Sequence, residues 1–193
     1  MPTTLTEIDV INIALVRLGD RQITSRTESN ERARTMDALY DGIRDKTLRE
    51  CPWNFATAQA TISADTTDPL YGFGNRYAYP SDFLYMIQTE DDEEYTLQEN
   101  YIHANSTTGI NNGSLNITYV KRVTDMSKAD SLFVEALSFK LAHDACENIT
   151  QSNTKKEQLL RDYENSISMA KRLNGQEKPS KVFVEDEWIT VRN

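Results

Sequence analysis

The sequence predicts an α+β fold. It comprises an antiparallel bundle of four helices, a β-rich and mainly antiparallel insertion between the second and third helices, and an extended C-terminal arm. Apolar residues recur every three or four positions in four segments, which is typical of helices that bury one face. Between Ala56 and Asp125 the spacing shifts towards two, as in half-buried strands. A short apolar segment follows the breaker Pro179-Ser180. The expected divisions are a helical domain at residues 1–55 and 126–176, an insertion at 56–125 and an arm at 177–193.

The first helix is expected from about Thr4 to Leu18. Thr4 and Glu7 have the spacing of a capping box, and Gly19 is a natural C-terminal stop. Its apolar face is formed by Leu5, Ile8, Ile11, Leu15 and Leu18.

The second helix is expected over about residues 30–51, with Ser29 as the candidate N-cap. Its apolar stripe contains Met36, Leu39, Tyr40, Ile43 and Leu48. Proline at position 52 ends the helix, because its ring fixes the backbone and removes a hydrogen-bond donor. Two large aromatic residues follow at once. Pro52, Trp53 and Phe55 are therefore predicted to form a structural junction that fixes the helices to the strand-rich region.

Short alternating or apolar runs predict the strands of the middle region. They are a run with Ala58, Ala60 and Ile62, then Phe83–Gln88, then Tyr95–His103, and a last run with Leu115, Ile117 and Tyr119. Asn112-Gly113 precedes the last run and has the sequence of a tight hairpin turn. The stretches Asp65–Pro69 and Gly72–Asn75 are rich in turn residues and are expected to be loops.

The third helix is expected to begin near Asp130 or Ser131 and to be the most buried element, because its apolar face is wide. That face contains Leu132, Phe133, Ala136, Leu137, Leu141, Ala145 and Ile149. The fourth helix is expected over about residues 153–173, with Asn174-Gly175 as its end. The polar turn between these helices is short, which favours antiparallel packing.

The C-terminal arm is too short to fold alone, yet it is rich in apolar side chains. Those predicted to bind a partner are Val182, Phe183, Val184, Trp188 and Ile189. Apolar side chains on a terminal segment need a surface to cover, and tryptophan is a common interface anchor. Two interpretations stay open: the arm lies on its own domain, or it docks on a neighbouring subunit or another protein.

Charge and composition exclude several classes of function. The chain of 193 residues has a net charge of −9, which argues against a general phosphate-binding surface with clustered Lys and Arg. No apolar run approaches about 18 residues, so no membrane-spanning segment is expected. The first residues lack the basic and apolar parts of a secretory signal peptide. The two cysteines, Cys51 and Cys146, are therefore expected to be reduced and packed.

Residues suited to catalysis or metal binding form no complete pattern. His143 and Cys146 lie three positions apart, but a structural zinc site needs four ligands and no CxxC or HxxxH completes the set. The acidic run Asp91–Glu94 lacks the alternating ligands and central glycine of a calcium loop, and is expected to be a solvated turn. No phosphate-binding GxxxxGK[ST] or GxGxxG motif and no GxSxG elbow occurs. We therefore expect no catalytic residue, metal or cofactor.

Basic and aromatic clusters are modest. The basic clusters are Arg32 with Arg34, and Lys155 with Lys156. They are expected to be exposed beside local acidic residues such as Glu157, or to contact an acidic partner surface. The aromatic run, in a turn-rich segment, is Tyr71, Phe73, Tyr77 and Tyr79. A sheet edge or subunit interface is favoured over base stacking, because only Arg76 is interleaved with these rings.

Three segments carry a resemblance to a known family. They are Ile11–Gly19 (INIALVRLG), Tyr40–Arg49 (YDGIRDKTLR) followed by Pro52-Trp53-Asn54-Phe55-Ala56, and Tyr119–Asp125 (YVKRVTD) leading into Phe133–Leu137 (FVEAL). The stretch Tyr77–Asp82 (YAYPSD) also fits. The chain resembles the tail tubular protein A family of short-tailed bacteriophages, over most of its length up to about residue 170. The Pro-Trp-Asn-Phe-Ala block is the most specific part of the match.

The resemblance implies a virion structural protein and not an enzyme. Such head-to-tail adaptors (connectors) form a ring of about twelve copies beneath the portal and present the platform for the tail nozzle. The implied partners are the portal protein, the tail nozzle protein and further copies of this chain, with no membrane. DNA passes through the ring without specific binding during genome ejection. The implied location is the virion tail at the portal vertex, and the host cytoplasm during assembly.

Two other function classes stay open. A glycan or cell-wall hydrolase acting during phage entry would need two acidic residues across a cleft, for which Asp91–Glu94 is a crude candidate. A DNA-packaging factor would be retained on DNA in a salt-dependent way.

Overall fold

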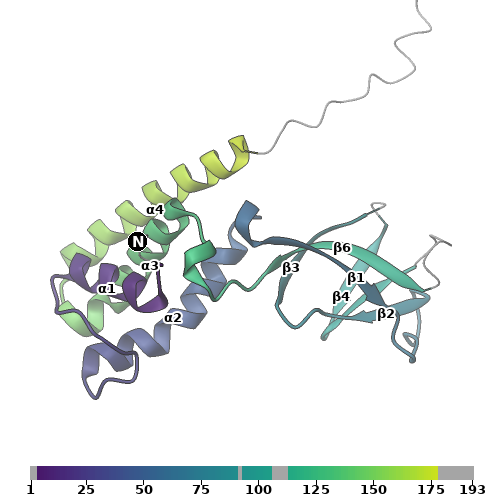
Figure 1. Ribbon diagram of the computed structural model, residues 1–193, viewed down its shortest axis with the longest axis horizontal. Coiled ribbons are helices and arrows are strands. Elements are labelled where there is room, and N and C mark those ends of the chain that lie inside the picture. Colours follow the sequence, from purple (N-terminus) through teal and green to yellow (C-terminus); the bar gives the residue numbers. More distant parts are fainter. Residues whose placement is uncertain (1–3, 91–92, 106–112, 178–193) are drawn as a thin grey trace, which may run out of the picture.

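The computed structural model describes residues 4–90, 93–105 and 113–177. In this part of the chain it shows a mixed α+β protein with four α-helices and two small antiparallel sheets. The helices gather at one end of the molecule and the strands at the other (Figure 1). All the described strands come between α2 and α3 in the sequence, so the chain crosses from helices to strands once and returns once.

Helix α1 spans Glu7–Leu18, and its N-cap is Thr6. The expected capping box of Thr4 and Glu7 is wrong, because Thr6 and Asp9 exchange the two hydrogen bonds. Leu5, the residue before the cap, packs half-buried against the helical core, and a helix starting at Thr4 would move it from this staple-like position. Gly19 ends the helix with a φ of 80°, as expected for a left-handed C-cap.

Helix α2 spans Glu31–Arg49 and is capped by the side chain of Asn30, one residue after the expected Ser29. Helix α3 spans Ser131–Thr150, is capped by Asp130 and packs against α1, α2 and α4. It buries more residues than any other described helix, as predicted.

Helix α4 spans Asn153–Gln176 and is capped by Ser152. The expected stop at Asn174-Gly175 is wrong, because both residues stay helical. Glycine in a helix costs about 1 kcal/mol relative to alanine. The side chain of Asn174 makes tertiary hydrogen bonds to the turn after α2, which offset this cost.

One sheet has the strand order β1-β6-β3 and the other β2-β5-β4, with every pair antiparallel. The strands are β1 Thr57–Ser63, β2 Asn75–Ala78, β3 Phe83–Thr89, β4 Tyr95–Gln98, β5 Tyr101–Ala104 and β6 Ser114–Lys121. The two sheets share one buried cluster, with Tyr77 and Ile102 from one sheet and Met86 and Ile117 from the other. They therefore pack face to face as a small sandwich.

Two strand predictions need correction. Tyr95–His103 is a hairpin and not a single strand, because Glu99 takes a left-handed φ of 51° and Gln98 pairs with Tyr101. Strand β2 begins at Asn75, where a loop was expected. The turn predicted at Asn112-Gly113 lies partly outside the described residues, although Gly113 has the positive φ that such turns need.

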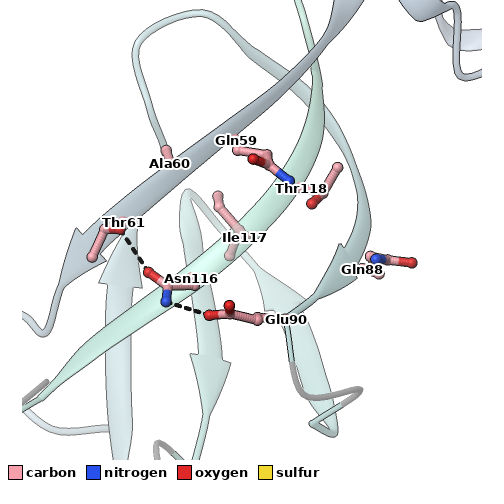
Figure 2. Close-up of a pocket in the computed structure, with 8 residues that line it drawn as sticks. All are labelled: Gln59, Ala60, Thr61, Gln88, Glu90, Asn116, Ile117 and Thr118. Carbon is pink, nitrogen blue, oxygen red and sulfur yellow. Dashed lines mark hydrogen bonds between the residues drawn. The ribbon is translucent and has the colours of Figure 1, made fainter. Parts of the chain in front are cut away.

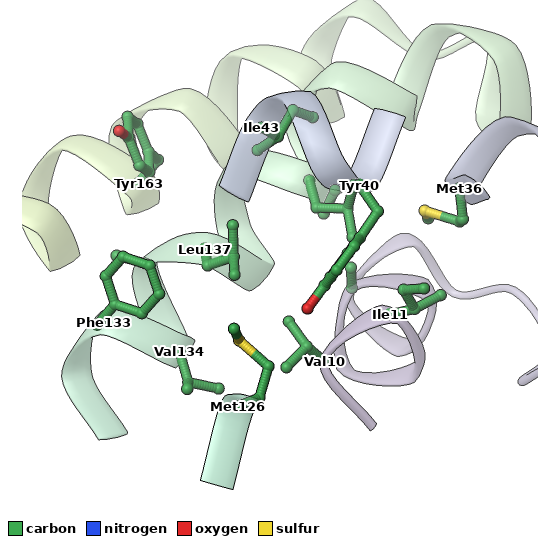
Figure 3. Close-up of a cluster of buried hydrophobic side chains, with 14 of the residues drawn as sticks. Val10, Ile11, Met36, Tyr40, Ile43, Met126, Phe133, Val134, Leu137 and Tyr163 are labelled. Carbon is green, nitrogen blue, oxygen red and sulfur yellow. The ribbon is translucent and has the colours of Figure 1, made fainter. Parts of the chain in front are cut away.

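The helical core is continuous from α1 to the base of the sheets. Figure 3 shows Val10 and Ile11 of α1 facing Tyr40 of α2, and Leu137 of α3 beside Met126. Leu84 of β3 and Val120 of β6 belong to the same cluster, so the strands enter the helical core where they begin and end. Within the described residues, no helix combines the length and apolarity needed to cross a bilayer.

Candidate functional site

The turn between α2 and β1 contains the predicted junction residues Pro52, Trp53 and Phe55. Trp53 is 1% exposed, and its indole N–H donates to the carbonyl oxygen of Thr47 at 3.1 Å. The rings of Trp53 and Phe55 meet Phe133 of α3 edge-on, at centroid distances of 5.2 and 5.0 Å. Edge-to-face aromatic pairs add about 0.5–1.5 kcal/mol beyond the area they bury. The turn is thereby fixed to α3 directly before β1 begins.

Asn54 joins the same turn to the end of α4. Its backbone N–H donates to Asn174 Oδ1 at 2.8 Å, and its side-chain Nδ2 donates to the carbonyl of Asn174 at 3.1 Å and to Glu177 Oε2 at 2.9 Å. Asn174 Nδ2 donates back to the carbonyl of Pro52 at 3.3 Å. The sequence alone marks Asn54 only as part of a matching block, because a partner 120 residues away leaves no local signal.

Glu50, at the C-terminal end of α2, also contacts α4. It accepts hydrogen bonds from the hydroxyl of Tyr163 and from Lys171 Nζ, the latter at 2.9 Å. Burial, together with the negative charge of Glu50, raises the pKa of Tyr163, so the phenol stays a proton donor at neutral pH. The hydrogen bonds to Glu50 therefore hold the C-terminal end of α2 against α4.

A groove opens between this junction, the start of α3 and the last turns of α4. Its cavity volume is about 540 Å³. Its apolar lining comes mainly from Phe55, Leu132, Ala170 and Leu173, and charged residues at its rim include Lys128 and Glu177. The chain described by the structure ends at this groove, since Glu177 is both its last described residue and part of the lining. The predicted anchors Val182, Phe183, Val184, Trp188 and Ile189 lie outside the described residues.

A second hollow, of about 390 Å³, lies on the open face of the sheet β1-β6-β3. Figure 2 shows Asn116 at its centre, accepting from Thr61 Oγ1 at 2.6 Å and donating to Glu90 Oε2 at 2.5 Å. Among the described residues of the lining, glutamine and threonine side chains make up most of the remainder, and Glu90 is the single ionisable side chain. These described residues offer hydrogen bonds to a partner, but they bring together no general acid and base.

An ionic contact links α2 to the segment after β6. Asp45 accepts from Arg44 Nη2 on its own helix and from Arg122 Nε, both at 2.8 Å. Arg49 Nη1 donates to the carbonyl of Leu84 in β3 at 2.6 Å. The contacts of the strands with α2 are therefore partly polar.

Within the part of the chain that the structure describes, the sequence-derived candidates for chemistry are not brought together in one site. His143 Nδ1 lies 2.6 Å from Asp144 Oδ1, while Cys146 is buried with its sulfur 3.1 Å from Thr150 Oγ1. Across the described residues, no group of three or more His, Cys, Asp or Glu side chains is placed to hold a metal ion. Of the acidic run, Asp91 and Asp92 lie outside the described residues.

Three of the four residues in the predicted basic clusters have local partners. Arg32 pairs with Asp20 at 3.4 Å, and Lys156 pairs with Glu147 at 2.8 Å, where Glu157 was the expected partner. Lys155 Nζ donates to the carbonyl of Leu18 at the C-terminal end of α1, a favourable position for a cation.

The aromatic run is divided by the fold. Tyr77 is fully buried in β2, which corrects its expected place in a loop, and Tyr79 stacks on Phe83 at 4.3 Å. Tyr71 is 87% exposed and the adjacent Leu70 is 98% exposed, so the loop between β1 and β2 presents two uncovered apolar side chains.

No protein-family model matches this chain, and a search of curated proteins returned no significant match.

Proposed function

We propose that the chain is a virion structural protein, the head-to-tail adaptor that joins the portal to the tail nozzle of a short-tailed bacteriophage. One observation carries the proposal: the Pro52–Ala56 block, the most specific part of the resemblance, lies where α2, α3, α4 and β1 meet. Trp53, Asn54 and Phe55 each make a structural contact there. Side chains that hold several elements together serve the packing of the fold, which supports a structural role for this block over a catalytic one.

The finer architecture is part of the proposal. Helices α1–α4 would form the body of a ring as an antiparallel bundle, the strands between α2 and α3 would form an insertion facing the tail, and residues 177–193 would form an arm that grips the portal. The two separate buried clusters, one mainly helical and one within the sheets, support this division.

Uncovered apolar side chains support assembly into a ring. Val16 on α1 is 57% exposed, Met169 on α4 is 49% exposed, and Leu70 and Tyr71 project from the β1–β2 loop. They lie on separate elements, and a ring built from identical head-to-tail contacts needs two different contact surfaces on each subunit. Single exposed apolar residues are common on monomers, so the loop pair carries more weight than Val16 or Met169.

The net charge supports a conduit for DNA more than a DNA-binding protein. With a charge of −9, the chain repels phosphates at distances up to a Debye length of about 8–10 Å. Because the chain would make few attractive contacts with DNA phosphates, DNA would pass through the ring without being held. The proposal therefore includes no specific DNA binding, no cofactor and no catalytic residue.

The proposal is tested by mixing the purified chain with the portal protein of the same phage and measuring masses by light scattering, then imaging the complex. We expect a ring of about twelve chains on the portal. No association with the portal would contradict the proposal. Salt-dependent retention on DNA would instead favour a packaging factor, and glycan cleavage that is lost on Asp-to-Asn change at Asp91 or Asp92 would favour a hydrolase.

The arm is tested by deleting Lys181–Asn193. We expect the deletion to weaken portal attachment more than it lowers the melting temperature, because the arm is short and separated from α4 by Pro179-Ser180. The matched control replaces Lys181 and Arg192 by Gln, which removes charge and keeps every apolar side chain. Unchanged portal affinity together with a large loss of stability would show that the arm serves only its own chain.

A further inference from the structure

The groove at the end of α4 is a place where apolar surface lies open beside the chain's own continuation. Phe55 and Leu132 line it half-buried, and Leu173 is 36% exposed within it. Phe55 packs edge-on against Phe133, which also contacts Trp53. Because Trp53 and Phe133 belong to the helical core, the groove floor is an extension of that core. An apolar surface continuous with a core is stabilised when further apolar side chains cover it.

The residues that follow Glu177 have the composition of such a cover. Val182, Phe183 and Val184 form one apolar group, and Trp188 and Ile189 form a second. An extended chain advances about 3.3 Å per residue, so Phe183 reaches up to about 20 Å from Glu177. Because Glu177 itself lines the groove, the first group has enough chain to turn back into it. A short tether holds it there at an effective concentration of about millimolar.

Charge favours the same occupant. Lys128 lines the groove with 72% of its side chain exposed and forms an exposed ion pair with Asp125 at 3.4 Å, and Asp130 and Glu177 also line the groove. In the sequence, Lys178 and Lys181 precede the first apolar group, and Glu185, Asp186 and Glu187 follow it. Lysines near Asp130 and Glu177, with the acidic triplet towards Lys128, would place opposite charges together. Exposed pairs of this kind select an orientation more than they add affinity.

We propose that this groove binds the chain's own C-terminal segment, with the apolar group Val182–Val184 covering Phe55, Leu132 and Leu173. The groove is then an intramolecular docking site that shields the segment until another surface competes for it. The inference stands on the groove and the sequence that follows it, and does not depend on the adaptor proposal. Were the adaptor proposal correct, portal binding would have to displace the segment from the groove.

The first experiment measures amide hydrogen exchange by mass spectrometry on the full chain. In the wild type, peptides covering residues 178–193 and the groove wall at 128–133 should exchange roughly tenfold more slowly than in Leu173→Asp, since a carboxylate in the groove repels apolar side chains. Met169→Asp is the matched control: it lies one turn earlier on α4, is 49% exposed and does not line the groove. It should leave the protection unchanged. Circular dichroism checks that both variants fold.

The second experiment identifies the occupant by disulfide trapping. In a Cys51→Ser background, Leu173→Cys is paired in turn with Val182→Cys, Phe183→Cys and Val184→Cys. We expect a monomeric disulfide at one or more positions, forming at a rate independent of protein concentration and roughly tenfold faster than with Met169→Cys.

Three outcomes would overturn the proposal. Equal trapping rates with Leu173→Cys and Met169→Cys, or free-peptide exchange of residues 178–193 in the wild type, would show that the segment does not dock in the groove. Disulfide-linked dimers that form faster at higher protein concentration would show that the occupant is a second copy. None of these results bears on portal binding, so this proposal and the adaptor proposal fail independently.

Discussion

The helical and strand regions of this chain are stabilised in different ways. Four helices carry side-chain caps at their N-termini and share a core that contains Trp53, Tyr40 and Phe133, all essentially inaccessible to solvent. The sheets bury a much smaller cluster, and the β1–β2 loop leaves Leu70 and Tyr71 uncovered. A large capped core makes a rigid scaffold, whereas a thin sandwich with exposed loops offers contact surface at lower stability. The helical region therefore contributes most of the buried core, whereas the strand region leaves more apolar surface uncovered.

The largest effect is expected at Trp53. Trp53→Ala should lower the free energy of unfolding by roughly 3–5 kcal/mol, because it opens a cavity between α2, α3 and β1 and removes the hydrogen bond to Thr47. Urea unfolding followed by circular dichroism measures it. Trp53→Phe is the control and should lose less, since it keeps an aromatic ring against Phe133. A loss below about 1 kcal/mol for Trp53→Ala would mean that the junction is not part of the stabilising core.

The second-largest effect tests whether the strand region unfolds separately from the helical region. Ile102→Ala should cost about 2 kcal/mol, at the low end for a buried Ile-to-Ala change, because the small sheet cluster is able to relax around the cavity. Hydrogen exchange should show faster opening of the strands, with α3 unchanged. Leu97 in β4 is the register partner of Ile102 but is 42% exposed. Leu97→Ala is therefore the control and should cost less than about 0.5 kcal/mol. Equal loss of protection in α3 would show that helices and strands unfold as one unit.

A smaller effect tests the connection between the turn after α2 and α4. Asn54→Ala and Asn174→Ala should each cost about 1–2 kcal/mol, because the Asn54 side chain donates to the end of α4 and the Asn174 side chain bonds to the turn after α2. The double variant should cost less than their sum, because both side chains join the same two segments. Asn165→Ala, on the exposed side of α4, serves as the control. Strict additivity would indicate that the two asparagines act independently.

The smallest expected effect is the pH-dependent contribution of Glu28, in the loop between α1 and α2, to the free energy of unfolding. Hydrogen bonds from the hydroxyl and backbone N–H of Thr24, and from Ser25 and Asn30, lower the pKa of Glu28 to about 2. A carboxyl with a lowered folded-state pKa stabilises the fold above its unfolded value of about 4.5, and this stability is lost as the pH falls towards 2. The stability difference between wild type and Glu28→Gln should therefore shrink over this range. A difference that stays constant from pH 6 to pH 2.5 would contradict the assignment, and NMR titration of the Glu28 carboxyl checks the pKa directly.

The helices were predictable from the sequence because their signals are local. Apolar periodicity and the residues near each terminus placed all four, with caps misassigned by one or two positions at Thr6 and Asn30. The element boundaries predicted wrongly are those that depend on contacts between distant residues or on an unusual backbone conformation. Asn174-Gly175 remains helical because Asn54 holds it, and the turn at Glu99 was missed because it uses a left-handed non-glycine residue.

The candidate site was only half predictable for the same reason. Trp53 and Phe55 were expected at a structural junction on account of their size and their place after a proline. The groove beside them was not expected, because it is assembled from three segments that lie far apart in the sequence. Its proposed occupant lies outside the described residues and is known from the sequence alone.

The pairing of β1 with β6 also bears on how such a chain can change over evolutionary time. Thr57, at the start of β1, is the register partner of Val120, near the end of β6. Partners in an antiparallel pair have Cα atoms about 4.5–5.5 Å apart, so the chain leaves the helices and returns to them at almost the same point. A two- to four-residue hairpin turn spans that gap. The part of the strand region that lies away from Leu84 and Val120 could therefore be shortened or lengthened without moving a helix, while these two side chains keep their places in the helical core.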